Sequence, residues 1–367
     1  MSTNVARCGL LIALWSLSGC ASLPGSAELR DSVSAYPGGS VPAAQDGRAR
    51  FREIFCPLVA PGGGQPYDAA DCDSLLWRLK DEPAPSTRAA VPPEPASDLR
   101  TFVVNGAFGD CRELDTIPFA DEIQRLASQG NHIQAVMVSG RSSTGHNARQ
   151  LAEAIRASGL AAGERIVLIG YSKGAIDILQ FLIDYPQLGQ QVVAVVSVAG
   201  AIFGSPLADK ADWSYRTLFA NSFSGVCEPG DGMVINSLLP DTRRQWLEQH
   251  PLPAQVAYFS LAAFPTGDHL SHGLKVPWRI LADSDRRNDG ELLVGDAVIP
   301  GSTLLGYVNA DHWDIAIEID RQMPHLSGRK SPRVFPRSEL LDAILLYVSE
   351  SLAPLPAATD TEIGIVP

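Results

Sequence analysis

A serine flanked by two glycines, in the segment GYSKG at residues 170–174, is the first candidate for chemistry in this chain. The apolar run RIVLIG precedes it and the amphipathic run AIDILQFLIDY follows it, so we expect a buried strand, a sharp turn and a helix. In such a turn the glycines leave room for the backbone, and the serine oxygen projects above the start of the helix. Short motifs recur by chance, but this one has the context that its chemistry requires. We therefore predict that Ser172 is a nucleophile rather than a helix-capping serine.

A serine hydroxyl needs a base that takes its proton, and the base needs a carboxylate that orients it. For a strand–serine–helix arrangement, the acid and then the histidine are expected later in the chain. His312 lies in LLGYVNADHWDIAI, just after an apolar run that predicts a strand. A loop at that position can carry an imidazole to the edge of a sheet. We predict that His312 is the base, with His272 as the alternative.

Several aspartates compete for the role of the acid: Asp283, Asp285, Asp289, Asp296 and Asp311. Asp289 is favoured because it lies in NDGELLV, where Gly290 permits a tight turn, and because one further strand fits between it and His312. Asp283 and Asp285 are the next choices. We expect Asp311, beside the histidine, to point elsewhere, and Asp296 to be a solvated loop residue.

An oxyanion formed at the serine needs two backbone N–H donors. One is expected from the residue after the nucleophile, Lys173. The other is expected in the turn after an early strand, where TFVVNGAFGD has small residues that let the backbone approach a substrate. We assign it to Ala107 or Phe108. We assign no metal ligand and expect no cofactor.

A regular series of elements, beginning at residue 99, must position these side chains. Apolar runs predict strands at LRTFVVNG, IQAVMVSG, RIVLIG, QVVAVVSVAG, AQVAYFSLAAF and STLLGYVN. Amphipathic segments predict helices between the first four of them, and RSELLDAILLYVSESL predicts a closing helix. This alternation indicates an α/β fold with a mainly parallel, doubly wound sheet. Residues 203–255 interrupt the rhythm, and we expect them to form a cap or lid insertion over the site.

The segments around the candidate residues resemble those of bacterial lipases and esterases, which are serine hydrolases of the α/β-hydrolase superfamily. VAGAIFGSPLAD resembles their segment after the strand that follows the nucleophile, NDGELLV their acid loop and ADHWDIA their histidine loop. The resemblance covers roughly residues 99–350. It departs at the serine, where bacterial lipases usually have His-Ser-Gln-Gly and this chain has Tyr-Ser-Lys-Gly.

The resemblance implies cleavage of a small-molecule or lipid carboxylic ester through an acyl-enzyme on Ser172. An acyltransferase or a thioesterase would use the same three residues. A non-catalytic envelope lipoprotein could instead use the scaffold for binding, because a fold does not dictate an activity. Candidates for all three catalytic residues occur in the expected chain order, which favours an enzyme. The sequence does not specify a protein partner.

The N-terminus has the features of a secretory signal: Arg7, then the apolar run LLIALWSL, then LSGC. The apolar run is too short to span a bilayer comfortably. LSGC resembles a bacterial lipobox, in which the cysteine becomes the lipidated first residue of the mature chain. The resemblance implies a lipoprotein signal peptide over 1–19 and a membrane anchor at Cys20. Ala21, rather than an aspartate, after the cysteine favours the outer membrane, facing the periplasm or the exterior.

The rest of the chain divides by composition. Residues 20–98 combine a flexible tether, a small disulfide-containing segment and a Pro-rich linker, and RARFREIFCPLV and DCDSLLWRLKDE within them predict two short helices. Residues 99–353 form the predicted hydrolase domain, and 354–367 a flexible tail. The formal net charge of −12, without a basic block, argues against a nucleic-acid partner.

Export would place the remaining cysteines in an oxidising compartment, where four of them allow three pairings into two disulfides: Cys56, Cys72, Cys111 and Cys227. We favour Cys56–Cys72, because both lie in the N-terminal segment, and this leaves Cys111–Cys227. The absence of a C-x-x-C pattern, and of a histidine at ligand spacing, argues against zinc.

Overall fold

A parallel sheet organises the computed structural model, which describes residues 28–30, 42–59, 72–84, 98–110, 117–161, 163–210, 230–328 and 335–353. Its seven strands lie in the order β1-β7-β6-β5-β4-β2-β3, and every neighbouring pair is parallel. The strands are β1 (Gln45–Asp46), β2 (Leu99–Val104), β3 (Ile133–Val136), β4 (Arg165–Tyr171), β5 (Val192–Val198), β6 (Ala257–Ala263) and β7 (Thr303–Val308). The predicted fold class is confirmed.

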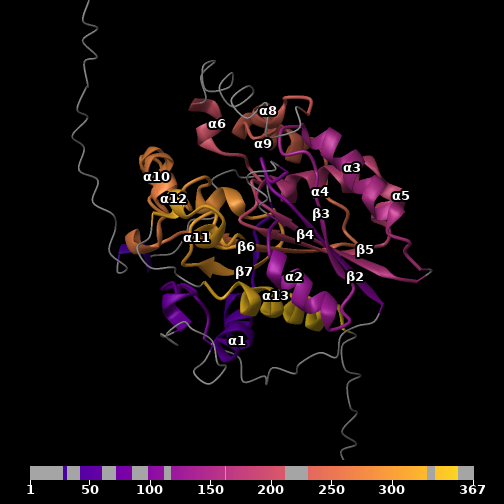
Figure 1. Ribbon diagram of the computed structural model, residues 1–367, viewed down its shortest axis with the longest axis horizontal. Helices are drawn as coiled ribbons and strands as arrows, with labels where there is room; N and C mark the ends of the chain where they lie inside the picture. Colours follow the sequence, from indigo (N-terminus) through magenta and orange to yellow (C-terminus); the bar gives the residue numbers. More distant parts are fainter. Residues whose placement is uncertain are drawn as a thin grey trace, which may run out of the picture.

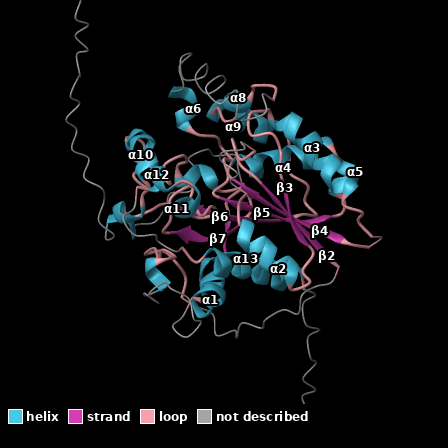
Figure 2. Cartoon of the chain, viewed as in Figure 1, coloured by secondary structure: helices cyan, strands magenta, loops and turns pink. Residues whose placement is uncertain are grey.

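The central strands are apolar along nearly their whole length because helices cover both faces of the sheet. On one face lie α3 (Thr144–Ala157), α4 (Lys173–Asp184) and α5 (Pro186–Gly189), and on the other α1 (Arg48–Leu58), α2 (Ala120–Ser128) and α13 (Arg337–Leu352) (Figures 1 and 2). Each face has its own buried cluster, one with Phe102 and Phe181 and one with Phe51 and Phe335. The strand order reverses between β2 and β4, which is where α/β sheets bind ligands.

The cap and the smaller helices gather over the carboxyl edge of the sheet, at the top and left in Figure 1. Within the expected insertion these are α6 (Pro206–Lys210), α8 (Val234–Ser237) and α9 (Pro240–Gln249). Three helices outside that insertion also contribute, which was not expected from the sequence: α10 (Lys275–Ala282), α11 (Ile319–Gln322) and α12 (Pro324–Ser327). Single 3-10 turns are η1 (Glu28–Arg30), η2 (Cys72–Ser74), η4 (Gly267–His269), η5 (His272–Leu274) and η6 (Val294–Ala297).

The N-terminal segment is built into the sheet rather than set apart from it. Gln45 in β1 pairs with Thr303 in β7, and α1 packs against α13. The guanidinium of the buried Arg52 bonds the carboxylate of Glu82 at 2.6 Å and that of Asp73 at 2.7 Å, so two stretches of this segment are joined below the surface. The described residues before 98 thus share the core of the domain that the sequence analysis began at residue 99.

Two short helices were predicted in this segment, and the prediction of the second is wrong. RARFREIFCPLV forms α1, but DCDSLLWRLKDE has a 3-10 turn at Cys72–Ser74 and no α-helix among its described residues. Leu76 makes an antiparallel bridge to Val308, and the Trp77 N–H bonds the Tyr307 carbonyl at 2.8 Å. Backbone pairing with β7 therefore overrides the local helical pattern.

A disulfide joins Cys56 to Cys72, which is the favoured pairing. Cys20, Cys111 and Cys227 lie outside the described residues, as do residues 1–27 and 354–367. Among the helices that the structure describes, none has both the length and the apolar character needed to cross a membrane.

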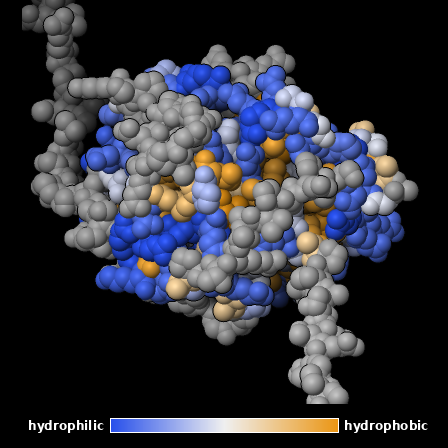
Figure 3. Space-filling view, turned by 90° about the horizontal axis from the view of Figure 1, so that it is seen from below, coloured by the Kyte–Doolittle hydropathy of each residue, from blue (hydrophilic) through white to orange (hydrophobic). Residues whose placement is uncertain are grey.

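Few large apolar side chains are exposed over the described residues. Figure 3 shows one face, on which blue hydrophilic residues surround a smaller group of orange apolar residues. Over the described ranges, the large apolar side chains that are exposed are Met137, Met233 and Val276.

Replacement of Phe51 by alanine tests whether the N-terminal segment belongs to the cooperative core. Phe51 is fully buried and its ring lies against those of Phe55 and Tyr347. Removing a buried aromatic ring leaves a cavity, so we expect the free energy of unfolding to fall by about 3–5 kcal/mol. Denaturant unfolding measures this, with the exposed-site variant Gln124→Ala as the control. Equal midpoints for Phe51→Ala and the control would mean that the segment unfolds separately from the sheet.

Candidate active site

Three side chains from distant parts of the chain form one hydrogen-bonded series at the carboxyl edge of the sheet. Ser172 Oγ lies 2.9 Å from His312 Nε2, and His312 Nδ1 lies 2.7 Å from Asp289 Oδ2. Their exposed fractions are 8%, 1% and 1% for the serine, histidine and aspartate. The structure therefore brings together the serine, base and acid that the sequence analysis selected, and their order matches that of a Ser-His-Asp triad.

Ser172 lies in the turn between β4 and α4 with a backbone φ of 54°. Few residues other than glycine adopt this conformation, and at such a turn it projects the side chain away from the strand. The two flanking glycines are required by close approach. A Cβ on Gly170 would lie 2.4 Å from the Cα of Ala175, and one on Gly174 would lie 2.5 Å from the carbonyl oxygen of Asn105.

The acid loop and the histidine loop are held together by several hydrogen bonds. Asp289 Oδ1 accepts the N–H groups of Glu291 at 2.8 Å and Leu292 at 2.7 Å, while its Oδ2 faces the imidazole. The His312 N–H donates to the Asp289 carbonyl at 2.8 Å. On the other side, the buried Tyr171 hydroxyl donates to the His312 carbonyl at 2.7 Å. The imidazole therefore has little freedom to turn away from the serine.

The surroundings of His312 favour its charged form. Burial, the largest influence, lowers the pKa of His312. The carboxylates of Asp289 and Glu291 act in the opposite direction, and Asp311 contributes less. Together they raise the pKa of His312 to about 9. The imidazolium that forms when a serine loses its proton is thus well stabilised here.

The expected oxyanion donors are placed on either side of Ser172. Lys173 is the first residue of α4, and the first N–H groups of a helix have no acceptor within it. Gly106 lies against the serine, since a Cβ there would be 2.8 Å from Ser172 Cβ. The Phe108 N–H donates to the Gly140 carbonyl at 3.0 Å, so the Phe108 part of the prediction is wrong for this conformation. Ala107 remains the second candidate.

The alternative candidates for the acid and the base do not contact Ser172 or His312 in the way that the triad requires. Asp311 accepts the N–H groups of Ser271 and Asp314, and so it shapes the loop. Asp285 pairs with Arg287. Asp283 and His272 are exposed.

Asp296 is not the solvated loop residue that was expected, because only 8% of it is exposed. Burial raises its pKa to about 7, and Arg244 acts weakly against this. It lies in η6, and its carbonyl accepts the Phe203 N–H at 3.0 Å. The η6 turn that contains it has four residues, too few to show a periodic pattern from which its burial could have been predicted.

A cavity of about 540 Å³ opens beside the serine. Ser172 and His312 lie in its wall, and most of the remaining lining is apolar. The cap supplies Leu207, Ala208, Ile235 and Leu238, and the region of α10 to α12 supplies Val276, Pro277, Ile280, Met323 and Leu326. Glu291 and Trp313 also line it, and neither was singled out from the sequence. Within the described ranges, no group of three or more His, Cys, Asp or Glu side chains is arranged to hold a metal ion.

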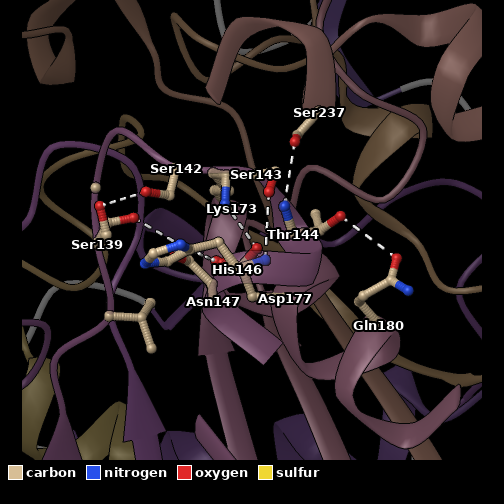
Figure 4. Close-up of polar contacts among 12 residues, drawn as sticks. Ser139, Ser142, Ser143, Thr144, His146, Asn147, Lys173, Asp177, Gln180 and Ser237 are labelled. Carbon is tan, nitrogen blue, oxygen red and sulfur yellow. Dashed lines mark hydrogen bonds and ion pairs between the residues drawn. The ribbon is translucent and has the colours of Figure 1, made fainter. Parts of the chain in front are cut away.

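Below the serine, a buried ion pair ties α4 to α3. Lys173 Nζ lies 2.6 Å from Asp177 Oδ1, and Asn147 Nδ2 donates to Asp177 Oδ2 at 2.7 Å and to the Ser139 carbonyl at 2.9 Å (Figure 4). Burial lowers the pKa of Lys173 and raises that of Asp177, and each partner opposes the shift of the other. The lysine side chain therefore points away from the cavity and into the protein, and its contribution to the site is structural.

Figure 4 also shows how the cap is attached to the start of α3. The Thr144 N–H donates to Ser237 Oγ at 3.2 Å, where α8 ends. Nearby, Ser143 caps α3 by accepting the His146 N–H, and its own N–H donates to Asp231 Oδ1 at 2.8 Å. The part of the cap that the structure describes is thus anchored to α3, the helix whose Asn147 contacts the ion pair of α4.

Replacement of Asp177 by alanine tests the buried pair. The change leaves the Lys173 ammonium buried without its carboxylate, and we expect a loss of about 3–5 kcal/mol in the free energy of unfolding. The double variant Lys173→Met, Asp177→Leu removes both charges and should recover most of that loss. Denaturant unfolding of both variants makes the comparison. If the double variant were no more stable than the single one, the unpaired charge could not be the cause.

Solved structures of an esterase and a lipase resemble this chain. The metagenomic carboxyl esterase MGS0156 is 36% identical, with 87% of this chain and 97% of that chain covered and a TM-score of 0.79. The propeptide form of the Bacillus licheniformis lipase BlEst2 is 21% identical, with 65% of this chain and 53% of that chain covered and a TM-score of 0.50, which shows a shared fold. No family model and no curated protein matches the chain. The extent of the first match and the arrangement around Ser172 agree: the chain belongs to the α/β-hydrolase superfamily, in the family of that carboxyl esterase.

Proposed function

We propose that the protein is a serine hydrolase that cleaves carboxylic esters through an acyl-enzyme on Ser172. The observation that carries this proposal is the unbroken hydrogen-bonded series from Ser172 Oγ through His312 to Asp289, in the wall of an apolar cavity. The extensive likeness to a carboxyl esterase supports the same reaction class.

In the first step, Ser172 Oγ attacks the acyl carbon while His312 Nε2 takes the hydroxyl proton. Asp289 stabilises the imidazolium that results, and the N–H groups of Lys173 and Ala107 stabilise the oxyanion. The bond to the leaving alcohol then breaks, and the imidazolium returns the proton to its oxygen. Water deprotonated by His312 attacks the acyl-enzyme in the same way and releases the acid.

The lining of the cavity supports an ester whose acyl or alcohol part is apolar. The side chains that α6, α8 and α10 contribute are mainly aliphatic, so burying a hydrocarbon chain there removes its surface from water. The cavity volume of about 540 Å³ lies within the range of small-molecule sites.

Turnover of a p-nitrophenyl ester series, from short to long acyl chains, tests the reaction in the form lacking residues 1–20. We expect Ser172→Ala to reduce kcat/KM by roughly 10³-fold or more, because no other group in the series can form the acyl-enzyme. Ser128→Ala, an exposed serine at the end of α2, is the matched control. Equal rates for Ser172→Ala and the parent would overturn the proposal. Loss of fluorophosphonate labelling in Ser172→Ala distinguishes an inactive scaffold from an enzyme with an untested substrate.

We also propose that a lipid on Cys20 tethers the mature chain to the bacterial envelope, at the outer membrane. The support is the LSGC segment after a signal-like apolar run, and Ala21 in the position that follows the cysteine. One acyl chain gives only marginal attachment, so a lipoprotein needs more than one chain for stable anchoring.

Incorporation of a fatty-acid analogue during expression of the full chain in bacteria tests the anchor. We expect label on the wild-type protein and none on Cys20→Ser, which should also leave the membrane fraction. Cys8→Ser removes the other cysteine of the signal region and should leave the labelling intact. Equal labelling of Cys20→Ser and wild type would rule out this attachment site.

A further inference from the structure

A second carboxylate faces the reacting nitrogen of His312. Glu291 Oε2 lies 3.3 Å from His312 Nε2, the same atom that lies 2.9 Å from Ser172 Oγ. Asp289, in contrast, contacts the opposite ring nitrogen, Nδ1. Resting on the proposed function, we propose that Glu291 is a further residue of the catalytic site that sets the pH range of the reaction and disfavours anionic substrates.

Glu291 is held in this position by contacts at both its side chain and its backbone. Trp313 Nε1 donates to Glu291 Oε1 at 2.8 Å, which leaves Oε2 directed toward the imidazole. The Glu291 N–H donates to Asp289 Oδ1 at 2.8 Å, and Ser205 Oγ donates to its carbonyl at 2.5 Å. Its side chain is nevertheless 39% exposed, because it lines the cavity. The carboxylate is therefore ordered and yet accessible to a substrate.

The ionisable groups around the imidazole differ in which atom of His312 they contact. Asp289 is buried at Nδ1, Asp311 is buried and bonds backbone N–H groups, and the Tyr171 hydroxyl bonds the His312 carbonyl. Glu291 alone among these acts at Nε2, through which the serine proton travels. A carboxylate there attracts the imidazolium and repels the lone pair of the neutral ring. It therefore stabilises the protonated base, both in the resting enzyme and in the transition state.

The stabilisation of protonated His312 by Glu291 has opposite effects on the reaction rate at low and at high pH. Below the pKa of His312, Glu291 keeps the base protonated and slows attack by the serine. Above it, where His312 is neutral at rest, Glu291 assists proton removal by stabilising the imidazolium that forms. Burial, the largest influence, lowers the pKa of His312, and among the groups that raise it Glu291 follows Asp289, which agrees with this placement.

The same charge bears on the choice of substrate. The ionisable side chains in the cavity wall are Glu291, Lys210, His312 and Tyr171, and Glu291, the carboxylate among them, lies 3.3 Å from the nitrogen that faces the serine. A negative group on the acyl chain near this carboxylate is repelled, and the largely apolar wall of the cavity screens that repulsion less than bulk water does. Neutral esters should therefore react faster than anionic esters of equal length.

Glu291→Gln is the test, because glutamine keeps the shape and can still accept the Trp313 N–H while losing the charge. Removing one charge at this distance should lower the kinetic pKa of the acid limb of kcat/KM by about one pH unit. With ordinary Brønsted behaviour, the variant should be about threefold faster than wild type below the limb and about threefold slower on the plateau. The two pH profiles should therefore cross, which a merely damaged site would not produce.

Substrate charge is tested at a single pH with p-nitrophenyl hexanoate and mono-p-nitrophenyl adipate, which have acyl chains of equal length. The ratio of kcat/KM for the two esters cancels the protonation state of His312. We expect the wild type to prefer the neutral ester, and Glu291→Gln to reduce that preference about fivefold. Glu248→Gln, an exposed glutamate on α9, is the matched control and should change neither readout.

The outcomes separate this inference from the proposed function. If the full chain hydrolyses neither ester, the pH dependence of fluorophosphonate labelling of Ser172 supplies the same crossing profiles. Parallel profiles and an unchanged ester ratio in Glu291→Gln would overturn the role of Glu291 while leaving the hydrolase intact. No Ser172-dependent labelling or turnover would overturn the proposed function, and this inference with it.

Discussion

The contact between Asp289 and His312 is the interaction on which the rest of the site depends. The aspartate uses one oxygen to close its own loop on two N–H groups and the other to bind the imidazole, while its carbonyl binds the histidine backbone. The two loops therefore form a single unit. Trp313 and Glu291 belong to this unit, because Trp313 follows His312 in the chain and Glu291 comes two residues after Asp289. Removing the contact would disturb the orientation of the base and the shape of the cavity wall together.

Much of this arrangement could be predicted because it follows from local rules. Central parallel strands are buried on both faces, and so they appear as short apolar runs such as RIVLIG. The sharp turn at Ser172 needs glycines on both sides, and the structure has no room for a Cβ at either. The order serine, acid, histidine then limited the choice to a few residues, of which His312 and Asp289 meet Ser172.

The remaining features depend on tertiary contacts that leave no periodic signal. β1 consists of two polar residues, Gln45 and Asp46, so no apolar run marks it in the sequence. The segment after Cys72 has a helical pattern, but Trp77 stacks on Phe264 at 5.1 Å and its neighbours pair with β7. The Glu291 side chain is 39% exposed, and nothing in the sequence distinguishes it from a surface glutamate. Its position beside the imidazole is therefore known only from the structure.

The pairing of β1 with β7 has a consequence for the order in which the chain can fold. Gln45 finds its partner at Thr303, so the first strand of the sheet is completed by the last one. Contacts between such distant residues form slowly, because a long loop must close before they contribute. The nascent chain cannot finish this edge of the sheet, or the histidine loop that follows β7, until nearly all of its residues are available. A chain built in this way stays incompletely folded until most of it has been synthesised.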